Sequence, residues 1–203
     1  MSLKTAEYDL NILVIDDDPA RAAVLEAALV EAGHAHVATI QCTTNLRQRI
    51  AAIAPDMVII DLKNPDRERL ERVFDVTRTV QKPVAMFVDK SDGDMVRRSV
   101  DAGVSAYVVD GLKRERVKPV VELAVSRFES FKKLTQERDE ARNALADRKT
   151  IDRAKGLLMR HRGIDEDAAY GMMRKAAMQQ SKKLVHIADS LITALEMDQD
   201  LLG

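Results

Sequence analysis

Three aspartates, Asp16, Asp17 and Asp61, are the residues of this chain whose type and spacing could do chemistry. Asp16 and Asp17 directly follow the apolar run 12–15, and Asp61 directly follows the apolar run 57–60. Converging carboxylates repel one another unless a cation neutralises them, and Mg²⁺ prefers hard oxygen ligands of this kind. A carboxylate held beside Mg²⁺ can also attack a phosphoryl group and form an acyl phosphate. We therefore predict a Mg²⁺ site made by these three side chains. The alternative is that acids at such positions only cap helices.

The elements that must position these acids are short apolar runs that alternate with amphipathic helices. Strands are predicted over residues 12–15, 36–40, 57–60, 84–88 and 106–109, and helices are predicted to begin near Pro19, Thr43, Asp66, Asp94 and Arg114. Five such repeats in about 120 residues imply an α/β fold with a doubly wound, five-stranded parallel sheet. Functional groups then gather beyond the carboxyl ends of the strands, which is where the acids fall. Asp18, directly before Pro19, is expected to cap the first helix.

The segments ILVIDDDP and PDMVIIDLKNP resemble the receiver domain of two-component response regulators, which has a flavodoxin-like fold. The resemblance covers residues 10 to about 119, and we place the receiver domain at residues 1–119. It implies that Asp16 and Asp17 belong to the metal pocket and that Asp61 is the phosphoacceptor. It also implies a sensor histidine kinase as a partner.

Two positions depart from the receiver pattern. Receivers usually carry Thr or Ser at the end of the fourth strand, where this chain has Val88, and Lys after the fifth strand, where it has Asp110. Val88 has no hydroxyl to bind a phosphoryl group, and the charge of Asp110 has the wrong sign to neutralise one. Lys113, Lys90 and Ser91 are the residues that could compensate. We therefore expect metal binding to persist and control to be independent of phosphorylation or exerted by a partner.

A long helix is predicted to connect the receiver to the rest of the chain. After Pro119, no Gly or Pro occurs before Gly156, and the composition is rich in helix formers. The apolar residues follow a spacing of three and four, which is typical of a short coiled-coil seam, so we predict a coiled-coil linker over residues 120–147 and a homodimer. The best anchors of the seam are Phe128, Phe131 and Leu134. The alternative, packing of the helix on its own receiver, is expected for its first part, up to about Ala124.

Residues 148–203 have the pattern of a small three-helix module. Apolar residues recur at helical spacing in three blocks, within 151–158, 168–177 and 184–195. Gly163 separates the first two blocks, Asp165 is expected to start the second helix, and Ser181 is expected to cap the third. Residues 148–188 contain ten Lys/Arg and four Asp/Glu, a net charge of +6 in a chain whose net charge is −1. Clustered positive charge is typical of phosphate-backbone binding, although an ordinary solvated surface can have the same composition.

The pattern I-x-x-A-K-G-L-L-M from Ile151, followed by the Gly, the acidic cap, A-A-Y, R-K-A-A-M and K-K-L-x-x-I-A, resembles the ANTAR domain of the AmiR/NasT regulators. This resemblance implies binding to stem-loops of leader RNA and transcription antitermination, as in NasT-like members. The residues expected to contact RNA are Arg153, Lys155, Arg160, Tyr170, Arg174, Lys182 and Lys183. Tyr170 is the only aromatic residue of the module, and both stacking on a loop base and sealing of the core are open to its ring. Met159, Met172, Met173 and Met178 are expected in the core.

We therefore interpret the chain as a response regulator that binds leader RNA. The resemblance implies that a ligand-sensing partner protein controls some AmiR/NasT members by sequestering them. A DNA-binding response regulator is the first alternative, because three short basic helices can form a helix-turn-helix. An adaptor whose output helices bind protein is the second. An enzyme is not expected, because beyond self-phosphorylation at Asp61 the sequence offers no nucleophile–base pair and its four histidines are scattered.

The composition favours a cytoplasmic protein. The single cysteine, Cys42, excludes an internal disulfide and any multi-cysteine metal site, which suits a reducing compartment. The sequence has no run of about 18 apolar residues and no basic-then-apolar leader, so neither a membrane span nor a signal peptide is expected.

Overall fold

The computed structural model describes residues 9–41, 45–63, 67–111 and 113–202, with side chains up to residue 197. The chain divides into two compact units, residues 1–132 and residues 133–203, and each unit is described by itself. Cys42 and the predicted helix starts at Thr43 and Asp66 lie outside the described residues.

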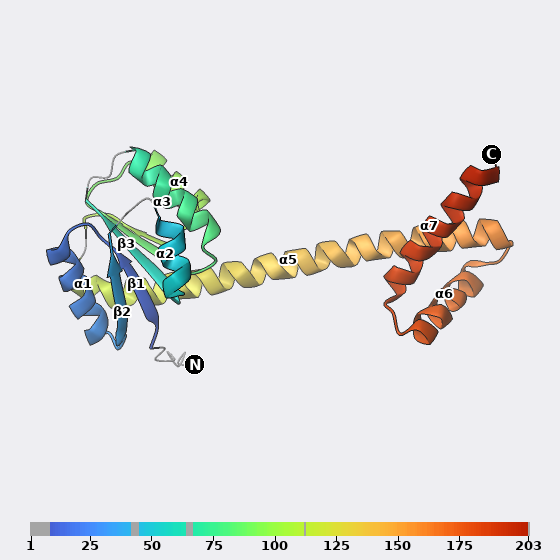
Figure 1. Cartoon of the computed structure of the whole chain (residues 1–203), viewed down its shortest axis with the longest axis horizontal. Coiled ribbons are helices and arrows are strands. Elements are labelled where there is room, and N and C mark those ends of the chain that lie inside the picture. The colour runs from blue at the N-terminus through green and yellow to red at the C-terminus, as the bar shows by residue number, and fades with distance from the viewer. Residues whose placement is uncertain (1–8, 42–44, 64–66, 112, 203) are drawn as a thin grey trace. The chain divides into compact units, whose positions relative to one another are not determined.

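The first unit contains the predicted five-stranded parallel sheet, in the strand order β2-β1-β3-β4-β5 (Figure 1). The strands are β1 (Asn11–Ile15), β2 (His36–Ile40), β3 (Met57–Leu62), β4 (Val84–Val88) and β5 (Ala106–Val108), joined through α1 (Pro19–Glu31), α2 (Leu46–Ile53), α3 (Arg67–Thr79) and α4 (Gly93–Asp101). Ile15 of β1 is in register with Ile60 of β3, so the acids that follow these two residues come from neighbouring strands at the same edge. The prediction of a doubly wound α/β fold is confirmed.

Both faces of the sheet are covered, which explains why its central strands are almost wholly apolar. On one face, Leu13 and Ile15 pack with Leu46 of α2 and Phe74 of α3. On the other face, the alternate strand residues pack against α1 and the start of α5 (Arg114–Arg162). The α5 residues buried there are Val117, Val121 and Ala124, which confirms that the first part of this helix belongs to the receiver core.

Helix α5 is longer than predicted. We predicted a helix that begins near Arg114, a connecting helix after Pro119 and a first helix of the output module, whereas the structure joins all three into one helix from Arg114 to Arg162. Pro119 lies in the second turn of α5, so the helix lacks the hydrogen bond that an N–H at this position would donate to the Glu115 carbonyl. Among the described residues, no helix combines the length and the apolar composition that a bilayer span requires.

The second unit contains the end of α5, α6 (Glu166–Gln180) and α7 (Leu184–Leu202). Its small core is built from alanines and a few larger residues at helical spacing: Ala154, Leu158, Ala169, Met173, Ala177, Ile187 and Ala188. Asp165 starts α6 as predicted, because its side chain accepts a hydrogen bond of 2.8 Å from the Ala168 N–H. Ser181 does not cap α7: its φ of 51° makes it the left-handed end of α6, and α7 begins only at Leu184. A left-handed terminal residue ends a helix by offering its N–H to the last free carbonyls, and this is the role that Ser181 takes.

Candidate functional site

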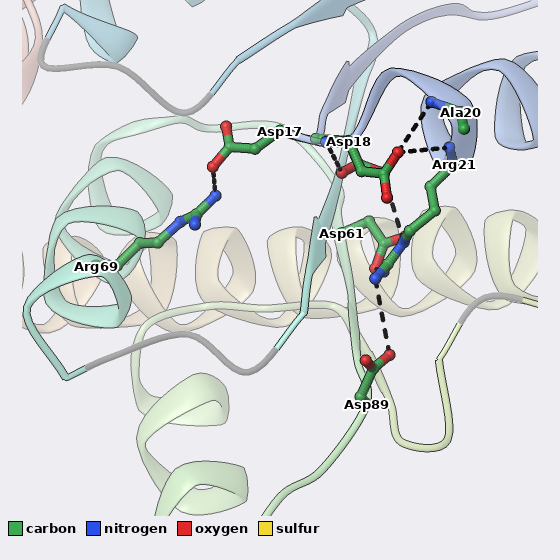
Figure 2. Close-up of polar contacts among 8 residues, drawn as sticks. Asp17, Asp18, Ala20, Arg21, Asp61, Arg69 and Asp89 are labelled. Carbon is green, nitrogen blue, oxygen red and sulfur yellow. Dashed lines mark hydrogen bonds and ion pairs between the residues drawn. The ribbon is translucent and has the colours of Figure 1, made fainter.

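Asp16 and Asp61 both lie beside Arg21 of α1 at the carboxyl edge of the sheet. Figure 2 shows the Arg21 side chain against Asp61. Both carboxylates are buried, with side-chain exposures of 4% for Asp16 and 0% for Asp61. The guanidinium of Arg21 donates to both oxygens of Asp61: Nε lies 3.0 Å from Oδ2, and Nη2 contacts Oδ1. This two-point arrangement uses the fork geometry that pairs a guanidinium with a carboxylate.

Arg21 also faces two further carboxylates. Its Nε lies 3.9 Å from Oδ2 of Asp16, and its Nη1 lies 3.9 Å from Oδ1 of Asp89, the residue that follows β4. One side chain thus links α1 to acids that come from three strand ends. Sequence reasoning missed Arg21, although a signal was present: a cation in the first turn of a helix opposes the helix dipole and calls for acids nearby.

Asp17 does not join the other two acids. It forms an ion pair with Arg69 of α3, on the other side of the pocket from Arg21 (Figure 2). Within the described parts of the chain, no three carboxylate, His or Cys side chains are grouped so that they could hold a metal. Of the predicted ligands Asp16, Asp17 and Asp61, the structure brings Asp16 and Asp61 together beside the guanidinium of Arg21, and the Mg²⁺ site itself stays a prediction.

Burial dominates the electrostatics of this pocket. It raises the pKa of Asp61 above its ordinary value of 3.8, and the hydrogen bonds and charge of Arg21 offset this rise only in part. Burial likewise raises the pKa of Asp16, opposed first by the hydrogen bond of 2.9 Å from the Asp18 N–H to its Oδ1. The other oxygen of Asp16, Oδ2, accepts no hydrogen bond. Asp18 itself caps α1 as predicted, because its carboxylate accepts from the Ala20 N–H at 3.0 Å.

The two altered receiver positions lie beside this pocket but do not enter it as ligands. Val88 is fully buried at the end of β4, and its carbonyl accepts a hydrogen bond of 3.0 Å from the Gly111 N–H. Asp110 is exposed and has a φ of 72°. Gly111 has a φ of 69°, and a Cβ there would lie 3.0 Å from Oδ1 of Asp89, so the loop requires glycine.

The compensating groups expected from the sequence are not the ones that meet Asp61. The Ser91 hydroxyl accepts a hydrogen bond of 2.8 Å from the Tyr107 hydroxyl. Lys90 and Lys113 are exposed. The cation that contacts Asp61 is Arg21.

In the output module, two of the expected RNA contacts are engaged within the module. Lys155 is only 15% exposed, and its Nζ lies 2.8 Å from Asp152 and 2.6 Å from Glu166, so it ties α5 to the start of α6. Arg153 pairs with Glu196 of α7 but keeps 63% of its side chain exposed. The structure thus gives Lys155 a packing role, which its charge alone did not reveal.

One face of α6 combines an aromatic ring, a cation and a thioether. Tyr170, Arg174 and Met178 are spaced by four residues, so they lie on one side of the helix, and all three are exposed. The tyrosine is 42% exposed and the methionine 67%. The prediction that the methionines form core is correct for Met173 and wrong for Met178, and also for Met172, which is 39% exposed. The reason is the helical period, since the buried stripe runs through residues 169, 173 and 177.

The predicted dimer anchors are apolar groups that the chain does not cover. Phe128 is half-buried, whereas Phe131 and Leu134 have exposures of 71% and 65%. Leu145, further along the same helix, is 56% exposed. Exposed apolar side chains along α5 are what a coiled-coil interface would have before a second chain binds to it. The homodimer stays a prediction.

Comparison with known proteins assigns both units. Residues 12–122 match the response regulator receiver domain, and residues 139–192 match the ANTAR domain. The transcriptional regulatory protein PdtaR of Mycobacterium tuberculosis is 32% identical over 146 residues, which are 72% of this chain and 71% of that protein. The nitrate regulatory protein of Klebsiella oxytoca is 32% identical over 76 residues, which are 37% of this chain and 19% of that protein. A crystal structure of a pilus assembly-related protein from Burkholderia pseudomallei, which is 20% identical, covers 63% of this chain and 96% of its own with a TM-score of 0.53; this similarity concerns the fold alone.

Proposed function

This chain belongs to the AmiR/NasT-like response regulators, in which a receiver domain precedes an ANTAR domain, and from this premise we propose that it binds stem-loops of leader RNA and promotes transcription antitermination. Membership of this family points to a regulator and not to an enzyme, and no enzyme family is indicated.

The observation that supports RNA binding best is the exposed face of α6 formed by Tyr170, Arg174 and Met178. Proteins that read RNA loops stack unpaired bases on aromatic rings and on guanidinium planes, and they hold the flanking phosphates with cations. A ring and a guanidinium one helical turn apart offer two such planes on one surface. The exposure of Tyr170 favours stacking over the alternative that its ring seals the core.

The remaining proposed contacts are cations around this face. Arg160, Lys182 and Lys183 are exposed, at the end of α5 and in the turn between α6 and α7. Arg153 can join them, because an exposed ion pair is worth only about 0–1 kcal/mol and is readily exchanged for a phosphate. Lys155 is left out, because its ammonium is engaged with Asp152 and Glu166.

We propose that the protein acts as a homodimer through Phe128, Phe131 and Leu134. Two output modules in one particle raise the effective concentration at a second stem-loop once the first is bound. The exposure of Phe131 and Leu134 supports this proposal, because they lie three residues apart on one side of the helix, and contiguous exposed apolar surface marks protein interaction sites.

Control of the output is proposed to come from a partner protein that senses a ligand, or otherwise without phosphorylation of Asp61. Three features support this: Asp61 is fully buried against Arg21, Val88 lacks a hydroxyl, and Asp110 stands where a phosphoryl-neutralising lysine is usual. The receiver family typically holds Mg²⁺ in its acidic pocket and accepts phosphate from a histidine kinase. A stable phosphoryl group on Asp61 that changes RNA affinity would contradict this part of the proposal.

The test is a mobility-shift titration of the full chain with a hairpin RNA and with duplex DNA of the same sequence, both at the same salt concentration. We expect a preference for the hairpin. Tyr170→Ala and Arg174→Ala should each weaken RNA binding by about tenfold, since one stacked base contributes about 1–3 kcal/mol. Lys175→Ala is the matched control, because it removes the same charge from an exposed neighbouring position on another face of α6.

Equal losses of RNA affinity in Arg174→Ala and Lys175→Ala would show that the α6 face contributes only non-specific charge. Tighter binding of the duplex DNA would instead support the DNA-binding alternative. Unchanged RNA affinity in both Tyr170→Ala and Arg174→Ala would remove the α6 face from the proposal, whereas no binding of the wild type to either nucleic acid would support the adaptor alternative.

A further inference from the structure

We propose that Arg21 is the resident cation of the acidic pocket: its guanidinium takes the position beside Asp61 that receivers otherwise give to a divalent metal, and it ties α1 to three strand ends without one. The inference concerns the receiver unit alone and does not depend on whether the output module binds RNA.

Asp61 uses both of its carboxylate oxygens on Arg21. Both accept hydrogen bonds from the guanidinium (Figure 2). The Asp61 side chain has an exposure of 0%, so none of its surface is open to a further cation while Arg21 is in place. Mg²⁺ demands about six oxygen ligands at roughly 2.0–2.1 Å in octahedral geometry. A guanidinium in two-point contact with the same carboxylate excludes that geometry sterically and repels the ion.

The other two acids, Asp16 and Asp17, are not arranged around Asp61 as metal ligands. Asp17 is engaged with Arg69 of α3, so it is turned from the pair that Asp61 makes. Asp16 keeps one oxygen, Oδ2, without a hydrogen bond, and its nearest cation is Arg21 at 3.9 Å. Asp16 Oδ2 thus offers one carboxylate ligand, and recruiting Asp61 or Asp17 as a second would require an arginine pair to break.

Arg21 lies in the first turn of α1, which is capped by Asp18 and begins at Pro19. Positive charge at this end of a helix is disfavoured by the helix dipole. Asp16, Asp61 and Asp89 offset this effect, since all three lie within 4 Å of the guanidinium by the distances above. The arginine thus offsets the charge of the acids, and the acids offset the unfavourable position of the arginine. An arginine that faced solvent at this position would not have this relation to them.

The consequence is a receiver whose acid pocket is already neutralised in part by its own chain. Three carboxylates share one guanidinium. Its planar fork reaches acids at three strand ends, which a metal would otherwise hold together. Changes in Mg²⁺ concentration then leave the pocket unchanged.

The experiment is a titration of the full chain with Mn²⁺, followed by electron paramagnetic resonance of the free ion. We compare the wild type with Asp61→Asn, Arg21→Ala, and the double variant with both changes. The matched control is Arg72→Ala, which removes an arginine from an exposed ion pair with Glu68 on α3. Circular dichroism confirms that each variant is folded.

We expect the wild type, Asp61→Asn and Arg72→Ala to bind Mn²⁺ equally weakly. Arg21→Ala should bind at least about tenfold more tightly, because Asp16 and Asp61 are then free to act as ligands, and adding Asp61→Asn should abolish the gain. Wild-type binding at one ion per chain that Asp61→Asn removes would overturn the proposal, and this comparison decides the matter even if Arg21→Ala does not fold. No gain in a folded Arg21→Ala would overturn it as well.

Discussion

The pairing of Arg21 with Asp61 makes a quantitative prediction about the stability of the receiver. In Arg21→Ala, the carboxylate of Asp61, which is buried in the wild type, loses both of its hydrogen bonds and its charge partner. Removing one partner of a buried ion pair destabilises a protein by about 3–5 kcal/mol. Because the Arg21 side chain is 22% exposed, solvent screens part of this interaction, and we expect a loss of about 2–3 kcal/mol near neutral pH. At about 2–4 °C per kcal/mol for a chain of this size, the melting temperature should fall by roughly 5–10 °C.

The pH dependence of this loss identifies its cause. Burial already raises the pKa of Asp61 above 3.8, and removing Arg21 takes away the largest influence that opposes the rise. An acid whose folded pKa is raised contributes a stability that is fully present below its unfolded pKa and is lost as the pH rises through its folded pKa. The deficit of Arg21→Ala should therefore shrink as the pH is lowered from about 7 toward about 4, because protonation of Asp61 removes the charge that needs a cation.

The assay is urea unfolding of the wild type, Arg21→Ala, Asp61→Asn and the double variant at both pH values, followed by circular dichroism. Asp61→Asn should restore part of the stability of Arg21→Ala at neutral pH, because it removes the uncompensated buried charge while keeping the shape of the side chain. A deficit of the same size at both pH values would show that the arginine acts through packing alone. Additive effects of the two substitutions would show that they do not interact, and either result refutes the reasoning.

Three further predictions concern other parts of the chain. Gly111→Ala should destabilise the receiver by about 1–2 kcal/mol in urea unfolding, because the left-handed backbone and the 3.0 Å approach to Asp89 leave no room for a Cβ; unchanged stability would mean that the loop simply shifts. Exchanging both Phe131 and Leu134 for Asp should convert a dimer to a monomer in sedimentation velocity at micromolar concentration without changing the melting of the receiver, and a wild type that is already monomeric would contradict the proposed seam. Lys155→Met should lower the thermal stability of the output module yet leave the salt dependence of RNA binding unchanged, whereas Arg174→Ala should reduce the slope of log K against log salt by about 1.

The sequence predicts the sheet well, because each strand is a short apolar run bounded by polar residues and the burial of both faces leaves little freedom in register. The strand-end rule also correctly places Asp16 beside Asp61. It cannot tell which way a side chain turns in the loop after β1. Asp16 and Asp17 are adjacent in sequence, yet one faces Arg21 and the other pairs with Arg69 of α3. That choice depends on cations from two different helices, which a single strand pattern does not reveal.

The output module shows the same limit in another form. The apolar period predicts three helices and their break at Gly163, but counting apolar residues assigns Met178 to the core although it stands one residue beyond the buried stripe. The sequence also does not predict correctly how α6 ends. Ser181 has the composition of a helix cap, and only the backbone geometry shows that it ends α6 in the left-handed region instead of starting α7.

The net charge of the basic segment is a poor guide to where its electrostatic field acts. Asp152 and Glu166 lie against Lys155, whose interaction with Asp152 lowers the pKa of that carboxyl, so these charges largely cancel within the module. The pair of Arg153 with Glu196 cancels further charge at the α5–α7 contact. The positive charge that remains outside such pairs includes Arg174, on the α6 face that also exposes the aromatic ring. In the proposed RNA complex, attraction of phosphates and stacking of bases therefore act at the same surface, and an ordinary solvated helix gives no reason for these two features to coincide.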